Sequence, residues 1–426
     1  MKPMHRMTVC GVVFLCALPT AWGQSSDPEV IAKLIARIEK LEKRVNELEA
    51  EKVAATHPAP SPALPAPPAA PGMPAMPGMS HGSQTDDLAA EHTYSAAPRL
   101  NLSGFSDLNF VASDQKGSKS GFSEGQFIFH VTSQLSRKVS YFGELSLTAR
   151  SDAGTGSPPA PGFNVEVERS IIRYDQNDYF KISFGRYHTP INYWNTQFHH
   201  GSWLQTTASR PEMAQFGGSF LPVHFVGALV EGTTPAGGLN LTYNAGIGNG
   251  RGATISRAGD FGDVNNNRAW LINSFVRPEI FDRIQIGASV YRDRINATGL
   301  PGTGEWIEAF HFVREKENPE IIAEFANVSH RPTGSNTAFN SQAWYVQLAY
   351  RIPAGERKWK PYYRYEYIHV PKGDAVFSRV PGLSQSTAGI RWDISSFSAL
   401  KFEYRSIDRP GQPHVNLGWA QTSFTF

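Results

Sequence analysis

Residues 341–370 read SQAWYVQLAYRIPAGERKWKPYYRYEYIHV and contain the pattern that decides the fold. In the second half of this stretch, the charged residues Lys360, Arg364 and Glu366 alternate with aromatic residues. Successive side chains of a β-strand point to opposite faces, so the charged residues share one face and the tyrosines share the other. The first half alternates in the same way, and a short connection, AGERK, joins the two halves. The stretch therefore predicts a pair of antiparallel strands.

The same pattern extends in both directions from this pair, from about Leu100 to Phe426. It contains about sixteen candidate strands, an even number, as bacterial outer-membrane barrels require. Short polar connections alternate with longer ones, of which 188–221, 250–266 and 371–383 stand out. Short turns on one side of a membrane and long loops on the other are typical of a transmembrane barrel. We therefore predict an all-β fold, an antiparallel transmembrane β-barrel over 99–426, preceded by a short α-helical coiled coil and a Pro-rich linker.

The composition and the end of the chain agree with this prediction. The mean hydropathy is −0.34, which a barrel tolerates because only every second residue of a strand meets lipid. A formal net charge of +2 gives no reason to expect a nucleic acid as a partner. The chain ends with Phe424, Thr425 and Phe426, and an aromatic pair of this kind after a series of strands is the usual assembly signal of such barrels.

The first 23 residues are expected to be a secretory signal peptide. Basic residues precede an apolar run that is too short to span a bilayer, and small residues follow it. Both cysteines, Cys10 and Cys16, fall within this segment. The secreted chain is therefore expected to contain no disulfide and no thiolate metal site.

Residues 28–52 have the pattern of a coiled coil. Arg37 and Arg44 fall at g positions, where each faces a glutamate at the following e position of a parallel neighbour. A single amphipathic helix is the alternative to a coiled coil. For a coiled coil, β-branched residues at a and Leu at d favour a dimer, whereas a porin barrel suggests a trimer. The apolar a and d positions are Ile31, Leu34, Ile38, Leu41, Val45 and Leu48.

Residues 53–98 form a Pro/Ala-rich linker, which is expected to be an extended spacer without a core. Methionines recur at every third residue in one part of it, and a histidine follows them. Thioethers and imidazole suit Cu(I), whereas the plain interpretation is apolar residues in a low-complexity segment, and no metal site is assigned. The residues concerned are Met73, Met76, Met79 and His81.

The charged faces of the predicted strands give candidate pore-lining residues. They are expected to face a wet interior because charge on the lipid face is costly. Basic residues modestly outnumber acidic ones on these faces. A pore with a weak preference for anions is one interpretation, and salt bridges that neutralise each other and favour no ion are the other. The candidates are Lys181, Arg283, Arg351, Lys360, Arg364, Glu366, Arg391, Lys401 and Arg405.

The connection 188–221 is too long for a bare turn and contains several aromatic residues. A constriction folded into the barrel would explain it, and an extracellular lid or a contact between subunits are the alternatives. His199 and His200 are adjacent, so on a strand they would point in opposite directions and bind a metal poorly. The constriction candidates are Tyr193, Trp194, His199, His200 and Trp203.

Four further stretches carry a resemblance to a known family. SFGRYHTPI, AWYVQLAYRI, WKPYYRYEYI and LKFEYRSID resemble the phosphate-selective porin family and related trimeric porins that carry a coiled coil. The resemblance covers roughly Leu100–Phe426 and implies a trimeric barrel of sixteen strands with passive diffusion of small anions or acids. No lysine cluster of the phosphate-specific members is visible, and acidic residues interleave with Arg364, Arg391 and Arg405.

These observations predict an outer-membrane porin for small hydrophilic, anionic solutes, with phosphate or small organic acids as candidates. No cofactor and no enzymatic activity are expected, because no convincing Ser and His pairing is found. The expected partners are the outer-membrane lipid and two further copies in a homotrimer. The alternative function is a structural anchor, in which a periplasmic coiled coil contacts peptidoglycan or another periplasmic partner.

Overall fold

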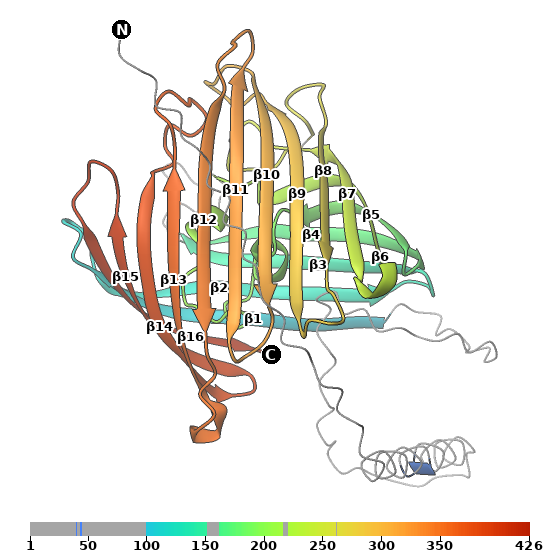
Figure 1. Ribbon diagram of the computed structural model, residues 1–426, viewed down its shortest axis with the longest axis vertical. Helices are drawn as coiled ribbons and strands as arrows, with labels where there is room; N and C mark the ends of the chain where they lie inside the picture. The colour runs from blue at the N-terminus through green and yellow to red at the C-terminus, as the bar shows by residue number, and fades with distance from the viewer. Residues whose placement is uncertain (1–39, 41–42, 45–98, 151–161, 216–219, 261) are drawn as a thin grey trace, which may run out of the picture. The chain divides into compact units, whose positions relative to one another are not determined.

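The computed structural model describes residues 40, 43–44, 99–150, 162–215, 220–260 and 262–426. Sixteen strands close into one antiparallel barrel in which each strand pairs with its neighbours along the chain (Figure 1). The predicted fold class and the predicted strand count are confirmed. The strands are β1 (Arg99–Ser113), β2 (Gly121–Gln134), β3 (Val139–Arg150), β4 (Gly162–Asn177), β5 (Phe180–His188), β6 (His224–Thr234), β7 (Leu241–Asn249), β8 (Ala269–Val276), β9 (Ile284–Ile295), β10 (Thr303–Arg314), β11 (Glu320–Pro332), β12 (Phe339–Ala349), β13 (Trp359–His369), β14 (Leu383–Ser395), β15 (Ser398–Asp408) and β16 (Val415–Thr425).

The first and last strands close the barrel. β1 and β16 form an antiparallel ladder, so the sheet has no free edge there. At the end of this seam, Gly104 and Phe426 exchange two backbone hydrogen bonds, of 2.8 and 3.1 Å. The Phe426 ring packs against Phe127 and Phe129 of β2. The terminal aromatic residue therefore lies in the closing seam.

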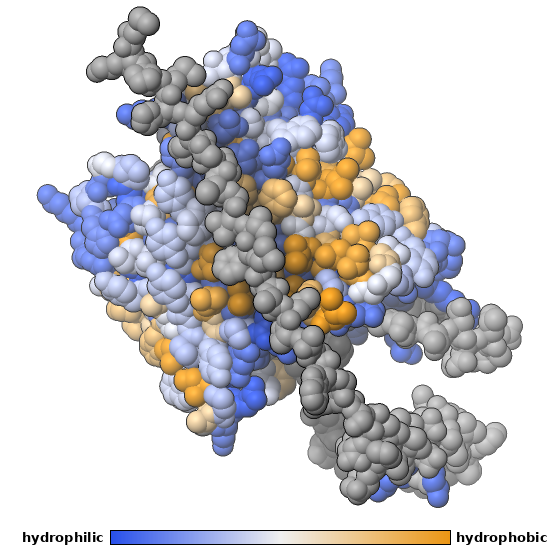
Figure 2. All heavy atoms as spheres, viewed as in Figure 1, coloured by the Kyte–Doolittle hydropathy of each residue, from blue (hydrophilic) through white to orange (hydrophobic). Residues whose placement is uncertain are grey.

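Side chains alternate between the outside and the interior of the barrel, as the period of two predicts. In β15, Phe402 and Tyr404 are 50% and 54% exposed, whereas Lys401 and Glu403 beside them are 0% and 4% exposed. Figure 2 shows hydrophobic side chains spread over the visible wall and hydrophilic ones gathered at the ends of the strands. An apolar outer wall around a polar interior is the arrangement that a hydrocarbon solvent favours.

The connections differ in length between the two ends of the barrel, but they do not alternate strictly as predicted. The shortest, 178–179 and 396–397, lie at one end, and the longest, 189–223, 250–268 and 370–382, lie at the other. The prediction fails at 350–358, which lies at the short-turn end and is longer than 333–338 and 409–414 at the opposite end.

The N-terminal predictions concern residues that lie almost entirely outside the described part of the chain. The predicted signal peptide (1–23) and linker (53–98) lie there, and so do the candidate Cu(I) ligands Met73, Met76, Met79 and His81. Within the predicted coiled coil, the described residues Lys40, Lys43 and Arg44 are helical. Among the residues that the structure describes, no helix is long and apolar enough to cross a membrane.

The closing seam makes a first prediction. Phe426→Ala removes the aromatic contacts with β2, each worth roughly 1 kcal/mol, at the point where the sheet must close. We expect a smaller fraction of folded barrel, measured as the species that changes its mobility on heating in gel electrophoresis. Phe310→Ala is the control, because this outer-wall residue of β10 is 56% exposed and its strand lies far from the seam. An equal yield from both variants would contradict the assigned role.

Candidate functional site in the barrel interior

One long connection, 189–223, crosses the inside of the barrel with its described residues, 189–215 and 220–223. It forms hydrogen bonds with Asp107 of β1, Glu324 of β11 and Lys401 of β15. A single segment can reach inward-pointing residues on such distant strands only from within a closed barrel. We call residues 189–223 the lumen segment; it contains the short helix α2 (Trp194–Gln197) and the 3-10 turn η1 (Glu212–Ala214). The described part of the segment is therefore not an extracellular lid.

The start of the lumen segment is held by one carboxylate. Glu324 Oε1 accepts the backbone N–H groups of Tyr193 at 2.7 Å and Trp194 at 2.6 Å. One oxygen thus satisfies two buried N–H groups that have no partner within a regular helix or sheet. The Trp194 side chain is fully buried and packs edge-on against Tyr345. This contact fixes where the chain turns into the barrel.

The interior also contains an apolar core, which the sequence pattern does not predict. Ile307, Ala326 and Val328 point inward from β10 and β11 and are 0% exposed. They belong to one cluster with apolar residues of the lumen segment, including Trp194 and Phe220. The prediction of a wet interior, made from the charged faces of other strands, does not hold on this side. The physical reason is that the lumen segment covers these side chains and removes them from water.

Arg364 of β13 binds the backbone in the middle of the lumen segment. Its guanidinium donates to the backbone carbonyls of Ser209 and Arg210, both at 3.1 Å, and to Glu366 Oε1 at 3.0 Å. The side chain is fully buried. A guanidinium offers five donors in a planar fork, so one residue can bind two carbonyls and a carboxylate together.

Two further cations bind the same stretch of backbone. Arg391 donates to the carbonyls of Trp203 at 2.7 Å and Gln205 at 2.9 Å. Lys401 Nζ donates to the carbonyl of Thr207 at 3.0 Å. These bonds satisfy buried carbonyl groups that have no partner within a regular sheet or helix.

Inward-pointing acids bind the N–H groups of this stretch. Glu403 Oε2 accepts from the backbone N–H groups of Ala208 at 3.0 Å and Ser209 at 3.1 Å. Glu366 Oε2 accepts from the N–H group of Glu212 at 2.7 Å. The wall thus presents cations to carbonyl oxygens and carboxylates to N–H groups, which holds an irregular stretch of chain inside the barrel.

Most of the predicted lumen residues lie on inward faces. Lys360 forms an ion pair with Glu320 at 2.6 Å, and Arg405 forms one with Glu212 at 2.8 Å. Lys181 pairs across the sheet with Glu231. Their role in lining an open channel stays a prediction. The residues that the structure places on inward faces are Lys181, Lys360, Arg364, Glu366, Arg391, Lys401 and Arg405.

The prediction for Arg283 is wrong. Arg283 is exposed, has a φ of +56°, and precedes β9, which begins at Ile284. A residue in the left-handed region interrupts the alternation of a strand, so the parity of the sequence does not extend to this position. The residue belongs to the connection between β8 and β9.

Arg351 follows β12 and belongs to an ion-pair cluster at the short-turn end. It lies 2.9 Å from Glu317 and also pairs with Asp393. Lys360 Nζ lies 3.1 Å from Glu317. Burial disfavours the ionised form of Glu317, but Lys360 and Arg351 outweigh it and hold its pKa below the ordinary value. The cluster therefore stays ionised at neutral pH.

The constriction candidates occupy different places in the lumen segment. Tyr193 and Trp194 are buried in the apolar core, and burial raises the pKa of the Tyr193 phenol well above its ordinary value. Trp203 is half-buried, and its ring lies 5.9 Å from the Arg391 guanidinium. The five candidates therefore have three different surroundings. Tyr193 and Trp194 lie in the apolar core, Trp203 lies beside Arg391, and His199 and His200 lie beside each other.

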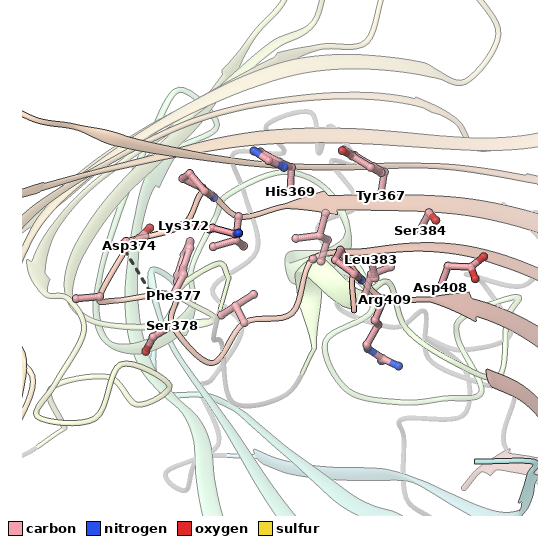
Figure 3. A pocket seen from close by; sticks show the side chains of 18 residues that line it. Tyr367, His369, Lys372, Asp374, Phe377, Ser378, Leu383, Ser384, Asp408 and Arg409 are labelled. Atoms are coloured by element: carbon pink, nitrogen blue, oxygen red, sulfur yellow. Dashed lines mark hydrogen bonds between the residues drawn. The ribbon is translucent and has the colours of Figure 1, made fainter. Parts of the chain in front are cut away.

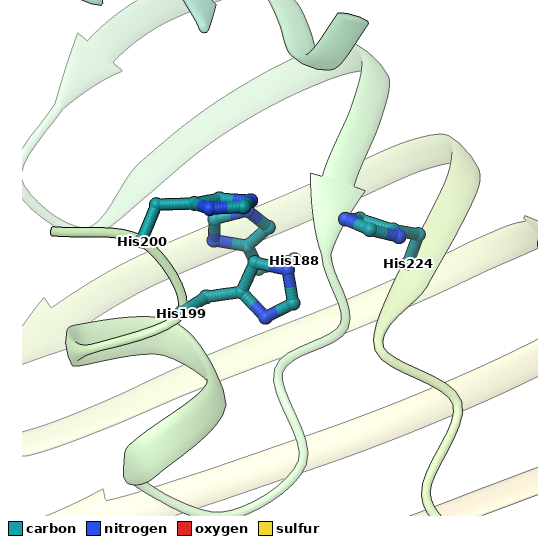
Figure 4. Close-up of side chains that lie close together, drawn as sticks. All are labelled: His188, His199, His200 and His224. Carbon is teal, nitrogen blue, oxygen red and sulfur yellow. The ribbon is translucent and has the colours of Figure 1, made fainter. Parts of the chain in front are cut away.

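The expectation that His199 and His200 diverge is wrong. They lie in the turn that follows α2, not on a strand, and their rings are 4.4 Å apart. Both lie beside His188 at the end of β5 and His224 at the start of β6 (Figure 4). Sequence reasoning misses the latter two because only the β5–β6 pairing brings them together. The one sequence feature that could have indicated them is their position, because each lies directly beside an end of the long connection 189–223.

A second long connection, 370–382, also turns toward the interior. Asp374 Oδ1 accepts the N–H groups of Val376 and Phe377, and the Phe377 ring stacks on Phe220 of the lumen segment at 5.2 Å. A cavity of about 900 Å³ lies beside this loop at the long-loop end (Figure 3). Its polar lining includes Lys372, Asp374, Ser384, Asp408 and Arg409.

The anchoring carboxylate makes a second prediction. Glu324→Leu removes the oxygen that accepts two buried N–H groups, and we expect a loss of about 2 kcal/mol of stability, seen as a lower melting temperature by circular dichroism. Glu308→Leu on β10 is the control, because that side chain is exposed. An unchanged melting temperature for Glu324→Leu would contradict its anchoring role.

Comparison with known proteins finds a likeness of fold. No family model and no curated protein sequence matches the chain. Salmonella typhi OmpF in complex with daunomycin is 13% identical, with 77% of this chain and 97% of that chain covered and a TM-score of 0.56. The anion-selective porin from Comamonas acidovorans is 12% identical, with 78% and 100% covered and a TM-score of 0.54.

A third solved structure, the outer-membrane channel DcaP of Acinetobacter baumannii, is 13% identical, with 79% of this chain and 100% of that chain covered. Its TM-score is 0.52. At these identities the likeness concerns the fold, and the barrel of this chain, with its sixteen antiparallel strands, is built as those of solved porins are.

Proposed function

We propose that the chain is an outer-membrane channel through which small hydrophilic solutes diffuse passively, and that it works as a homotrimer. The observation that carries the proposal is the inverted distribution of side chains. Charged groups such as Arg364 and Lys401 are enclosed by the barrel, whereas large apolar side chains are exposed on its wall. A protein surrounded by water gains nothing from that distribution, but one surrounded by lipid does.

We infer a preference for anions, with phosphate or small organic acids as candidate solutes. On β13, β14 and β15 the inward cations outnumber the inward acids. Backbone carbonyls, which do not cancel charge, bind Arg364, Arg391 and Lys401, so the positive field would be strongest along these three residues. Lys360 and Arg405 are neutralised in part by Glu320 and Glu212 from outside these strands. The cations are Lys360, Arg364, Arg391, Lys401 and Arg405, and the acids are Glu366, Asp393 and Glu403. The likeness in fold to a porin described as anion-selective is in keeping with this inference.

The lumen segment would form the constriction of this channel. Its two faces differ, because one packs into the apolar core and the other is bound by the charged wall of β13 to β15. A solute would therefore pass beside the segment, along polar groups. The coiled coil at 28–52 would lie in the periplasm, where contact with peptidoglycan is a second role that does not exclude transport.

Planar-bilayer recording in a KCl gradient tests the proposal. We expect closure in three steps, one for each barrel of a trimer, and a zero-current potential of the sign that anion preference produces. A folded protein that inserts and never conducts would refute the channel function. A potential of the opposite sign would refute only the anion preference.

One ion pair at the short-turn end allows a matched test of selectivity. Lys360→Gln removes an inward cation and Glu320→Gln removes the acid bound to it. We expect the anion-to-cation permeability ratio to fall about twofold in the first variant and to rise about twofold in the second, measured from zero-current potentials. Shifts of the same sign in both variants would mean that the pair affects the barrel's structure and not its field.

The grip of Arg364 makes a further prediction about conductance. Lys cannot reproduce a planar fork, so Arg364→Lys should loosen the lumen segment and give a larger and noisier single-channel current. Arg292→Lys on the outer face of β9 is the control, since that side chain is exposed. A current indistinguishable from that of the control would show that Arg364 does not position a constriction.

A further inference from the structure

Four histidines converge inside the barrel where the lumen segment leaves β5 and returns to β6 (Figure 4). Each offers a ring nitrogen, and these four atoms all lie within 4.8 Å of one another. The ring centroid of His188 is 4.0 Å from that of His199 and 5.5 Å from those of His200 and His224. His188, His199 and His200 are at most 6% exposed.

Two different elements bring these rings together. His188 and His224 are direct partners in the β5–β6 ladder, so their side chains emerge side by side from the wall. His199 and His200 come from the turn that ends α2, and the buried helix places them over that pair. The cluster therefore joins the wall to the lumen segment.

The hydrogen bonds of the cluster orient its rings. His199 Nδ1 lies 2.9 Å from Asn195 Oδ1, and His200 Nδ1 lies 3.3 Å from Gln126 Oε1. For His199, an acceptor at Nδ1 places the proton there and leaves Nε2 as the basic atom, which is how metal-ligating histidines are oriented in proteins.

Two buried carboxylates border the same site. Glu168 Oε2 lies 2.8 Å from His224 Nε2 and 3.3 Å from His200 Nε2, and Glu144 Oε2 lies 3.4 Å from His188 Nε2. Anionic groups at this distance stabilise a bound cation. They also offer the simplest competing explanation, a network in which protonated histidines share the carboxylates without any metal.

We propose that His188, His199, His200 and His224 form a binding site for a divalent first-row transition metal that fastens the lumen segment to β5 and β6. Imidazole suits Zn²⁺, Ni²⁺ and Cu²⁺, and four nitrogens suit the tetrahedral geometry of Zn²⁺. Bonds of about 2.0–2.1 Å place tetrahedral ligands about 3.4 Å apart. The separations here, all within 4.8 Å, exceed that by at most about 1.4 Å, which rotations of the rings can supply.

The role of this site would be mechanical and goes beyond passage of solutes. Glu324, Arg364 and Lys401 hold the segment against β11, β13 and β15. The histidines lie at the opposite wall. There, His200 of the segment contacts Gln126 of β2 and Glu168 of β4. A metal bound there would add an attachment to β5 and β6. The segment would then be held at both walls, and its movement would be limited.

Cobalt spectroscopy tests the proposal on the full chain, purified without a polyhistidine tag and stripped with chelator. Tetrahedral Co²⁺ absorbs visible light intensely, and we expect one Co²⁺ for each chain, displaced by Zn²⁺ and accompanied by a rise in melting temperature. The double variant His199→Gln/His224→Gln should bind at least about 100-fold more weakly. Heat-dependent gel mobility verifies that the variant barrel is folded.

Two matched variants keep the test specific. His311→Gln removes another buried inward histidine, which bonds Gln285 outside the cluster, and it should leave Co²⁺ binding unchanged. His81→Gln in the linker should also leave it unchanged. No tetrahedral Co²⁺ spectrum at micromolar metal, equal binding in the double variant, or loss of binding in His81→Gln would each overturn the proposal in favour of a metal-free network or a different site.

Discussion

The closure of β1 onto β16 is the constraint on which the rest of the structure depends. A backbone group that faces hydrocarbon has no water to bond, so every strand of a membrane-spanning sheet needs a neighbour on both sides. The ladder between β1 and β16, which ends where Gly104 and Phe426 exchange hydrogen bonds, supplies the last pairing. Once the sheet is closed, each strand has one face toward lipid and one face toward an enclosed interior.

The enclosed interior must accommodate the charged side chains that point into it. Charged side chains that cannot face lipid must point inward, where they lose most of their water. The lumen segment resolves this by presenting backbone groups to them: Arg364 binds carbonyls, and Glu324 and Glu403 bind N–H groups. The same contacts hold 189–223 in place, although it has little regular secondary structure. The wall and the segment therefore stabilise each other.

The two sides of the interior differ in chemistry. The wall of β13 to β15 carries an excess of cations, whereas the wall near β3 to β6 carries Glu144 and Glu168 together with the histidine cluster. The lumen segment lies between them and bonds to both. An anion would follow the first wall, and a divalent cation would be held at the second. The proposed transport and the proposed metal site thus use separate groups.

Alternation along the sequence was enough to predict the barrel, its strand count and the inward direction of residues such as Lys401, because the period of two is a local property of the chain. It failed at Arg283, where a left-handed turn residue ends the alternation. It also failed for the interior, because the apolar core forms only when 189–223 covers Ile307 and Val328.

The histidine cluster shows the same division between local and non-local information. The adjacency of His199 and His200 is visible in the sequence, but His188 and His224 become their neighbours only through strand pairing across a long connection. The sequence by itself determined which face meets lipid in strands where charged and aromatic residues alternate, such as β13 and β15, because that alternation depends on neighbours along the chain. Only the tertiary structure decided what fills the barrel, because that depends on contacts between residues far apart in the chain.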